Sequence, residues 1–142
     1  MRFIPLLLIF LLFSCSANEN EWYLGAWKVS DAKFPGISAM GMEEAKVWFG
    51  SEAIYTKTKV AFRDETCDSP EFKMASLTEA EFFSSYRATF KQLEIEGESV
   101  EILQVGCPAN WIAPGSTLIK ANSNFGYTLW DGVFFKVDKV DS

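Results

Sequence analysis

Hydrophobic and polar residues alternate along much of the chain after its first twenty residues, and this alternation predicts short β-strands. Residues 53–63 show it most clearly, with Ile54, Val60 and Phe62 on one face and mainly basic residues on the other. Side chains of a strand point alternately to its two faces, so this segment is predicted to be one half-buried strand. Shorter runs predict further strands at 22–29, 72–75, 90–95, 99–106, 117–121, 126–130 and 133–138.

Turn-forming residues separate these strands. Asn122-Ser123-Asn124 lies between two of them, and Glu96-Gly97-Glu98 is placed to close a hairpin. Asp131-Gly132 is the type of pair favoured by two-residue hairpin loops. The last third of the chain is therefore predicted to be a series of antiparallel strands.

Two segments have features of short helices. Residues 42–49 place hydrophobic side chains at helical spacing, and Gly50 follows as a candidate C-terminal cap. Ser76-Leu77-Thr78-Glu79 matches a capping box, which predicts a second helix that ends near Tyr86.

Seven or eight short strands with two short helices predict a mainly β fold, with α+β at the margin. A small antiparallel barrel or a strongly curved sheet fits this composition. Residues 22–142 are enough for a single domain with a hydrophobic core.

The N-terminal segment has the pattern of a secretory signal peptide. Arg2 precedes an apolar run of eleven residues, Phe3 to Phe13. A membrane-spanning helix needs about 20 such residues, whereas a signal peptide needs about 7–15. Residues 1–14 are therefore predicted to be removed on export rather than to form a buried helix of the domain.

The residues after this run leave two cleavage sites open. Leu12-Phe13-Ser14-Cys15 resembles the bacterial lipobox, which implies that Cys15 becomes lipidated and that residues 15–21 form a short tether. Cleavage after Ala17 is the alternative and would give a secreted or periplasmic protein. Ser16 follows Cys15, which on the lipoprotein interpretation implies an outer-membrane lipoprotein facing the periplasm, if the host has two membranes.

The cysteine count agrees with export. Of three cysteines, processing at Cys15 leaves Cys67 and Cys107, forty positions apart. A disulfide between them is predicted, because bridges persist in oxidising compartments. Closing a loop of this length stabilises a fold by about 4 kcal/mol in the chain-entropy model.

The charge of the chain limits its partners. The formal net charge of −6 becomes −7 once a leader containing Arg2 is removed. An acidic protein is poorly suited to nucleic acid or anionic lipid headgroups, so no nucleic-acid partner is expected. A basic protein partner is compatible with this charge, and we expect the domain itself to be a monomer.

No catalytic constellation is evident, and neither a cofactor nor a metal site is predicted. The chain contains no histidine, which removes the usual general base and the commonest metal ligand. Asp64, Glu65 and Asp68 do not have EF-hand spacing and are interpreted as a polar turn. Asp131 is explained by its hairpin, and the adjacent Ser84 and Ser85 lack a nucleophile motif.

Gly25-Ala26-Trp27 on the first strand, followed by a short helix and antiparallel strands, resembles the G-x-W opening of lipocalins and related calycins. The resemblance implies a barrel in which Trp27 plugs the closed end and the other end admits a small apolar ligand. The family's arginine near the last strand is missing, and Lys136 or Lys139 is the available substitute. The chain from Cys67 to Phe135 is also similar to a group of small bacterial exported proteins, which implies compartment and compactness alone.

Five tryptophans could line a pocket or fill a core: Trp22, Trp27, Trp48, Trp111 and Trp130. Trp111 and Ile112 belong to a segment predicted to be an exposed loop, 108–114, which suits a partner contact. We therefore expect binding rather than catalysis, with Trp27, Trp130, Trp111 and Ile112 as candidate contacts.

Two binding functions are compatible with the sequence. A carrier or sensor of a small apolar ligand predicts an internal cavity. A protein-interaction module, for example an inhibitor or an envelope-assembly accessory, predicts a filled barrel with an acidic face.

Overall fold

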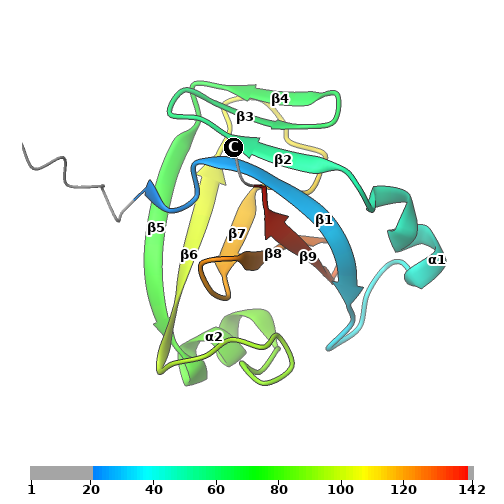
Figure 1. The fold of residues 1–142 in the computed structure, drawn as a ribbon, viewed down its shortest axis with the longest axis vertical. Helices are drawn as coiled ribbons and strands as arrows, with labels where there is room; N and C mark the ends of the chain where they lie inside the picture. Colours follow the sequence, from blue (N-terminus) through cyan, green and yellow to red (C-terminus); the bar gives the residue numbers. More distant parts are fainter. Residues whose placement is uncertain (1–20, 141–142) are drawn as a thin grey trace, which may run out of the picture.

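The computed structural model describes residues 21–140, which form one antiparallel sheet of nine strands with short helices (Figure 1). The signal peptide, the lipidation of Cys15 and the tether up to residue 20 lie outside the described residues. The strands are β1 (Gly25–Lys33), β2 (Glu52–Tyr55), β3 (Lys59–Phe62), β4 (Glu65–Asp68), β5 (Glu71–Thr78), β6 (Ser99–Gly106), β7 (Thr117–Lys120), β8 (Phe125–Trp130) and β9 (Val133–Lys139). The helices are α1 (Met42–Ala45), the 3-10 turn η2 (Lys46–Trp48) and α2 (Glu79–Tyr86).

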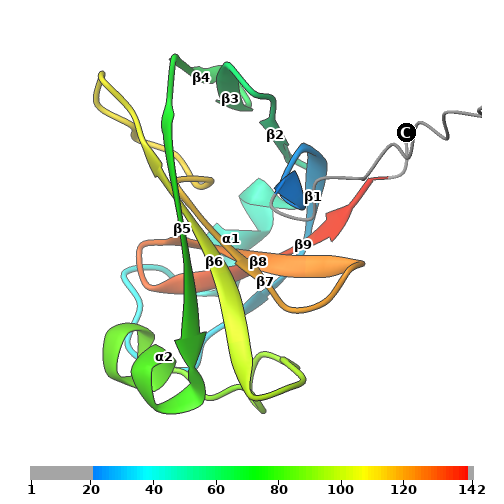
Figure 2. The same cartoon turned by 90° about the vertical axis from the view of Figure 1, so that its left-hand side faces the viewer.

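The sheet is strongly curled rather than flat. Its strand order is β4-β3-β2-β1-β9-β8-β7-β6-β5, so β4 and β5 are the two edges. These edges are consecutive in the sequence and are joined by Ser69 and Pro70 alone. The sheet must therefore bend back on itself to bring its ends together, which gives the half-barrel in Figures 1 and 2. The mainly β, strongly curved fold expected from the sequence is confirmed, with nine strands in place of seven or eight.

Residues 53–63 are two strands, and the prediction of a single strand is wrong. A turn at 56–58 separates β2 from β3, and the backbone N–H of Thr56 donates to the Lys59 carbonyl at 2.9 Å. The turn changes which residues face inward before and after it. Tyr55 is therefore buried, whereas Ile54 is exposed.

The polar segment that follows is also a strand rather than a turn. Arg63 adopts a positive φ of 52°, so the chain reverses at Arg63-Asp64 and continues as β4. Val60 and Cys67 are paired in the β3–β4 hairpin, which directs the Cys67 side chain into the core. The alternation at 65–68 is too short and too polar to reveal this strand.

Residues 90–95 form successive turns, and the predicted strand there is wrong. Thr89 and Gln92 exchange hydrogen bonds: the Thr89 N–H donates to the Gln92 side chain at 2.8 Å, and the Gln92 N–H to the Thr89 hydroxyl at 3.1 Å. The N–H groups of Leu93 and Ile95 then both donate to the Phe90 carbonyl. These local bonds satisfy backbone groups that a strand would pair across a sheet.

The second helix begins two residues later than the sequence motif suggested. The capping box is formed by Thr78 and Glu81 instead of Ser76 and Glu79. Ser76 belongs to β5, whose pairing with β6 continues through Thr78. The first strand likewise starts at Gly25 rather than at residue 22.

The strands with the clearest local patterns agree with prediction. The bounds of β6 are those expected from the sequence, and β7, β8 and β9 differ by only one residue at an end. Asp131 and Gly132 both have positive φ, 51° and 79°, as a two-residue hairpin of the type favoured by Asp-Gly requires.

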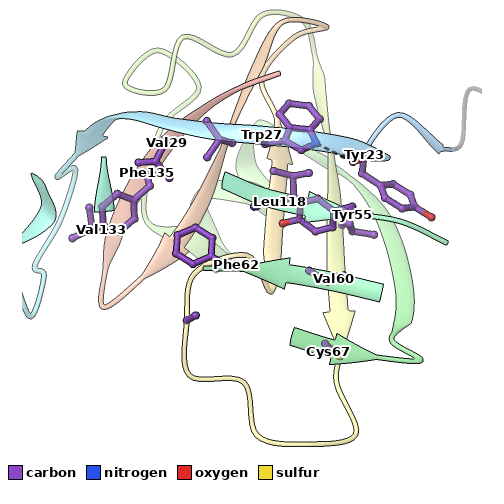
Figure 3. Close-up of a cluster of buried hydrophobic side chains, with 14 of the residues drawn as sticks. Tyr23, Trp27, Val29, Tyr55, Val60, Phe62, Cys67, Leu118, Val133 and Phe135 are labelled. Carbon is purple, nitrogen blue, oxygen red and sulfur yellow. Dashed lines mark hydrogen bonds between the residues drawn. The ribbon is translucent and has the colours of Figure 1, made fainter. Parts of the chain in front are cut away.

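Two hydrophobic clusters cover the two faces of the sheet. The inner cluster lies within the curl and is formed by strands from all around it, as Figure 3 shows for Trp27, Tyr55, Phe62, Leu118 and Phe135. The outer cluster lies between the sheet, α2 and the turns at 88–95; its members are Phe82, Ala88, Phe90, Leu93, Ile95, Val100, Ile102, Ile119, Ala121, Tyr127 and Phe134.

Candidate functional sites

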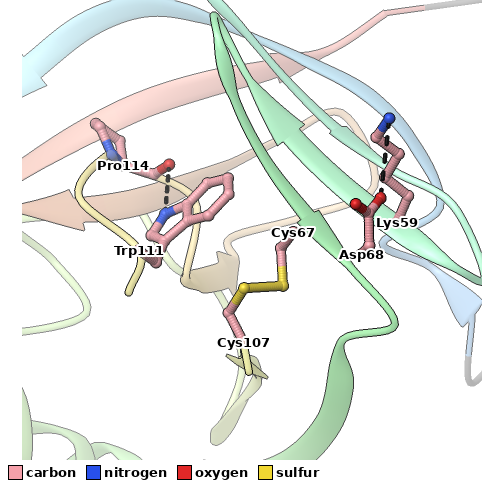
Figure 4. Close-up of a disulfide and its surroundings, with 6 residues drawn as sticks. All are labelled: Lys59, Cys67, Asp68, Cys107, Trp111 and Pro114. Carbon is pink, nitrogen blue, oxygen red and sulfur yellow. Dashed lines mark hydrogen bonds and ion pairs between the residues drawn. A yellow bond between two sulfur atoms is a disulfide. The ribbon is translucent and has the colours of Figure 1, made fainter. Parts of the chain in front are cut away.

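A disulfide joins the two ends of the curled sheet. It links Cys67 on β4 to Cys107, the residue directly after β6, with a Cα–Cα distance of 5.8 Å (Figure 4). The predicted bridge is confirmed. It fixes the start of the loop 107–116 against the far edge of the sheet.

The same loop is anchored again at its other end. Gly115 has a φ of +114°, a conformation that favours glycine. Its carbonyl accepts a hydrogen bond from the buried Tyr55 hydroxyl at 2.7 Å, and its N–H donates to the buried Thr128 hydroxyl at 2.9 Å. The loop is therefore held at both ends by buried contacts with strands of the sheet.

Trp111 contributes to the shape of this loop. It is half-buried against the inner cluster, and its indole Nε1–H donates to the Pro114 carbonyl at 3.3 Å (Figure 4). Its ring also lies against Gly115, 3.7 Å from where a Cβ would be. Of the two residues expected to be exposed on this loop, Ile112 is the one that is: 65% of its surface is accessible.

Ile112 borders a shallow pocket of about 210 Å³, whose other walls include Trp48, Phe62 and Arg63. The Arg63 guanidinium lies 4.5 Å from the centre of the Trp48 ring. It also donates to the Ser51 hydroxyl at 2.6 Å and to the Val47 carbonyl. These contacts hold the Arg63 guanidinium over the tryptophan ring, since a guanidinium can contact a ring face and donate hydrogen bonds at once.

We call this surface the loop patch; it comprises Val47, Trp48, Arg63, Asp64, Glu65 and Ile112. Val47 is as exposed as Ile112, and Asp64 is exposed beside them. The patch thus combines apolar side chains with a fixed cation and two carboxylates. The sequence indicated Ile112, but it gave no sign that η2 and the β3–β4 turn meet the loop.

Trp27 and Trp130 lie elsewhere and do not join Ile112 in one site. Trp27 is 1% exposed, and its Nε1–H donates to the Tyr23 carbonyl at 2.8 Å. Lys139 places its ammonium 4.8 Å from the Trp27 ring centre. Trp130 ends β8 and is half-buried against the inner cluster. Both indoles therefore contribute to packing.

A second pocket, of about 300 Å³, lies beside Trp27. It is lined by Trp22, Trp27, Lys120, Asn122, Ser123 and Lys139. These residues come from β1 and the turn before it, from β7 and the turn after it, and from β9. Trp22, Trp27 and Lys139 were considered from the sequence, but not as one site with Lys120, Asn122 and Ser123, because these residues lie far apart along the chain.

A larger cleft, of about 500 Å³, lies on the opposite side of β9 from the inner cluster. Ile37, Tyr86, Leu129 and Phe134 are among its walls. The loop that carries Ile37 is held in place because the Ala39 N–H donates to the Asp131 carbonyl at 2.8 Å. The Asp131 backbone therefore ties this loop to the β8–β9 hairpin.

The titratable side chains of residues 21–140 differ in clustering, pairing and burial. No group of three or more potential metal-ligating side chains occurs there. Asp68 has Lys59 4.0 Å away on the neighbouring strand, in an exposed pair. Burial raises the pKa of the Tyr55 hydroxyl, which donates to a carbonyl and so stays protonated. Burial, with smaller contributions from Glu94 and Asp31, also raises the pKa of Tyr127.

Within the described residues, no helix is both long and apolar enough to cross a membrane. No protein-family model matches the chain, and neither a curated protein nor a solved structure matches it.

Proposed function

We propose that this protein is a lipid-anchored binding protein of the cell envelope that recognises a basic surface of another protein through the loop patch. The observation that carries the proposal is the way Ile112 is presented. A disulfide, Trp111 and Gly115 hold its loop rigid, while the isoleucine itself stays exposed beside the Trp48–Arg63 stack. A rigid loop loses little conformational entropy on binding, which favours affinity.

The filled interior of the curl supports a surface site over an internal one. Trp27, Tyr55, Phe62, Leu118 and Phe135 occupy it and are each at most 1% exposed. The interior of a barrel of about eight strands is just wide enough for side chains to fill it, and the large side chains here occupy the curl. The loop patch instead presents tryptophan and arginine, the residue types that contribute most to protein interfaces.

The charge of the patch indicates the chemistry of the partner. Asp64 and Glu65 lie at its rim, and the domain carries a net negative charge. Complementary basic groups on the partner would speed association and make it sensitive to salt. Arg63 stays on the tryptophan face and provides a donor for a partner carbonyl or carboxylate.

Export and anchoring are part of the proposal and rest on the sequence alone. Processing at Cys15 would place the domain on the outer membrane, facing the periplasm, on a tether of residues 15–21. The mass of the mature N-terminal peptide tests this. A lipid-modified Cys15 supports the anchor, whereas an N-terminus at Asn18 would show ordinary cleavage after Ala17.

Affinity capture from envelope extracts of the host tests the binding site. The chain from Asn18 onward contains every strand and both clusters, and serves as bait. An Ile112→Asp variant should lose a partner that the wild type retains at low salt. Ile37→Asp is the matched control, because Ile37 is an exposed isoleucine on a loop outside the patch. Retention of the same partner by Ile112→Asp would refute the proposed site.

A carrier or sensor of a small apolar molecule is the second candidate. The observation that favours it is the cleft lined by Ile37, Leu129 and Phe134, whose volume is in the range of small-molecule sites. In this case the ligand would lie outside the curl instead of within it. Ile37→Asp would then be the variant that loses binding, and Ile112→Asp the control.

A further inference from the structure

The pocket beside Trp27 is a cationic site on an acidic protein. Two lysine ammonium groups, from Lys120 and Lys139, line it together with two indoles. No carboxylate is among its lining residues within the described chain. The net negative charge of the protein does not attract anions over long distances. Lys120 and Lys139 can therefore attract an anion only at short range.

Lys139 is held at the base of the pocket. Its Nζ donates to the Trp22 carbonyl at 2.6 Å and lies over the Trp27 ring. A carbonyl and a ring face each carry only partial negative charge, so the ammonium is not neutralised by them. Partial burial, and then the neighbouring Lys120, lower its pKa; a negative charge between the two ammonium groups would offset their mutual repulsion.

Lys120 supplies the second cation and is only partly compensated. Its Nζ lies 3.3 Å from a Glu101 carboxylate oxygen and 5.7 Å from the Trp22 ring centre. Glu101 is half exposed, so solvent screens this pair. The Lys120 side chain can therefore turn toward an anion in the pocket at little cost.

The turn after β7 adds two neutral donors. The Asn122 side-chain oxygen accepts from the N–H groups of Asn124 and Phe125, at 2.8 and 2.9 Å. This fixes the amide and leaves its NH₂ group to donate elsewhere. Ser123 lines the same wall with a hydroxyl.

We propose that this pocket binds a phosphate group carried on an organic molecule, whose apolar part lies against Trp22. Four side chains that carry donor groups line it: Lys120, Asn122, Ser123 and Lys139. A phosphate ester offers three strongly accepting oxygens and up to two negative charges, which matches this donor set better than a carboxylate does.

The phosphate has two possible sources with the same chemistry. One is a soluble phosphate ester. The other is a phospholipid headgroup, because Trp22 directly follows the proposed tether of 15–21. A chain of seven residues spans at most about 25 Å, so a lipid anchor at Cys15 would keep this pocket near the membrane surface. This site is independent of the loop patch and does not depend on a protein partner.

The test is a titration of the Asn18–Ser142 domain with phenyl phosphate, followed by the indole N–H signals in NMR spectra. Saturable shifts of the Trp22 and Trp27 signals are expected, and phenol, which lacks the phosphate, should not produce them. Lys120→Gln should weaken binding about tenfold, the loss expected for one charge-assisted hydrogen bond. Lys91→Gln is the matched control, because Lys91 is exposed and lines none of the pocket.

Vesicles of phosphatidylglycerol diluted in phosphatidylcholine separate the two sources. Displacement of phenyl phosphate by these vesicles would identify a lipid headgroup as the source of the phosphate. A lack of displacement would identify a soluble ester, and both results agree with the proposal. Absence of saturable indole shifts, or equal weakening by Lys120→Gln and Lys91→Gln, would overturn it. Because Lys139 also supports Trp22, Lys139→Gln is used only together with a melting curve that shows it is folded.

Discussion

The two hydrophobic clusters use the same strands but are enclosed in different ways. On β6, β7 and β9, neighbouring residues alternate between them: Leu103, Leu118 and Phe135 point inward, and Ile102, Ile119 and Phe134 outward. The strands that enclose the inner cluster come from the whole length of the domain, from β1, which begins at Gly25, to β9, which ends at Lys139. The outer cluster is covered by a single stretch, from α2 through the turns that end at Ile95.

This difference separates global from local stability. Contacts between distant parts of the chain close the inner cluster, so its loss should unfold the whole sheet. A contiguous segment covers the outer cluster, so this cover can open while the sheet persists. The proposed sites follow the same division: the loop patch and the Lys120–Lys139 pocket both depend on the inner enclosure.

The largest effect is expected from Trp27→Ala. Removing this fully buried indole leaves a large cavity in the inner cluster and removes the ring that the Lys139 ammonium contacts. The unfolding free energy should fall by about 5 kcal/mol. Denaturant unfolding measures it. A loss comparable to that of an exposed substitution would mean that Trp27 does not anchor the inner cluster.

Loss of the disulfide is expected to rank second. Cys67→Ala with Cys107→Ala should lower the unfolding free energy by about 4 kcal/mol, because the forty-residue loop is no longer closed in the unfolded chain. Hydrogen exchange should rise in β4 and in the loop 107–116 and change little in α2. Equal acceleration of exchange in α2 would contradict the separation of the two clusters.

Phe82→Ala tests the outer cluster. Phe82 is fully buried between α2 and the sheet, and its removal should cost about 3 kcal/mol, with exchange rising first in α2 and at 88–95. Phe83→Ala is the matched control, since Phe83 is 46% exposed and its loss should lower the unfolding free energy much less. Similar losses of unfolding free energy for both variants would show that α2 does not cover the outer cluster through Phe82.

The smallest effect concerns the start of α2. Thr78→Ala removes the side chain that accepts from the Glu81 N–H and should cost about 1 kcal/mol, confined to exchange in α2. Ser76→Ala, at the position where the sequence motif begins, should have almost no effect. Thermal melts of the two variants decide which residue caps the helix, and a greater loss for Ser76→Ala would reverse the assignment.

The sequence predicted the elements whose signals are local. β6 and the hairpin of β8 and β9 have clear alternation or an Asp-Gly turn, and these are correct. The turn at 56–58 contains neither glycine nor proline, so two strands looked like one. At 89–95 two reciprocal hydrogen bonds between Thr89 and Gln92 favour turns, although the sequence pattern of this segment predicts a strand.

The sites were less predictable than the strands. Export context and cysteine parity were sufficient to predict the Cys67–Cys107 bridge, and the loop composition indicated Ile112 as a contact. The stacking of Arg63 on Trp48 beside Ile112, and the meeting of Lys120 with Lys139, depend on how the sheet curls. Such tertiary proximity leaves no periodic pattern in the sequence.

The measurement that tests the central claim most directly is native mass spectrometry of the Asn18–Ser142 domain, purified without detergent from an oxidising periplasm. The account places recognition on the surface of a filled domain, and so predicts a monomer without an apolar ligand. Under denaturing conditions its mass should be lower than that of the reduced chain by about two hydrogens, as one disulfide requires. A small apolar molecule that survives purification and leaves on denaturation would contradict the account and establish a carrier.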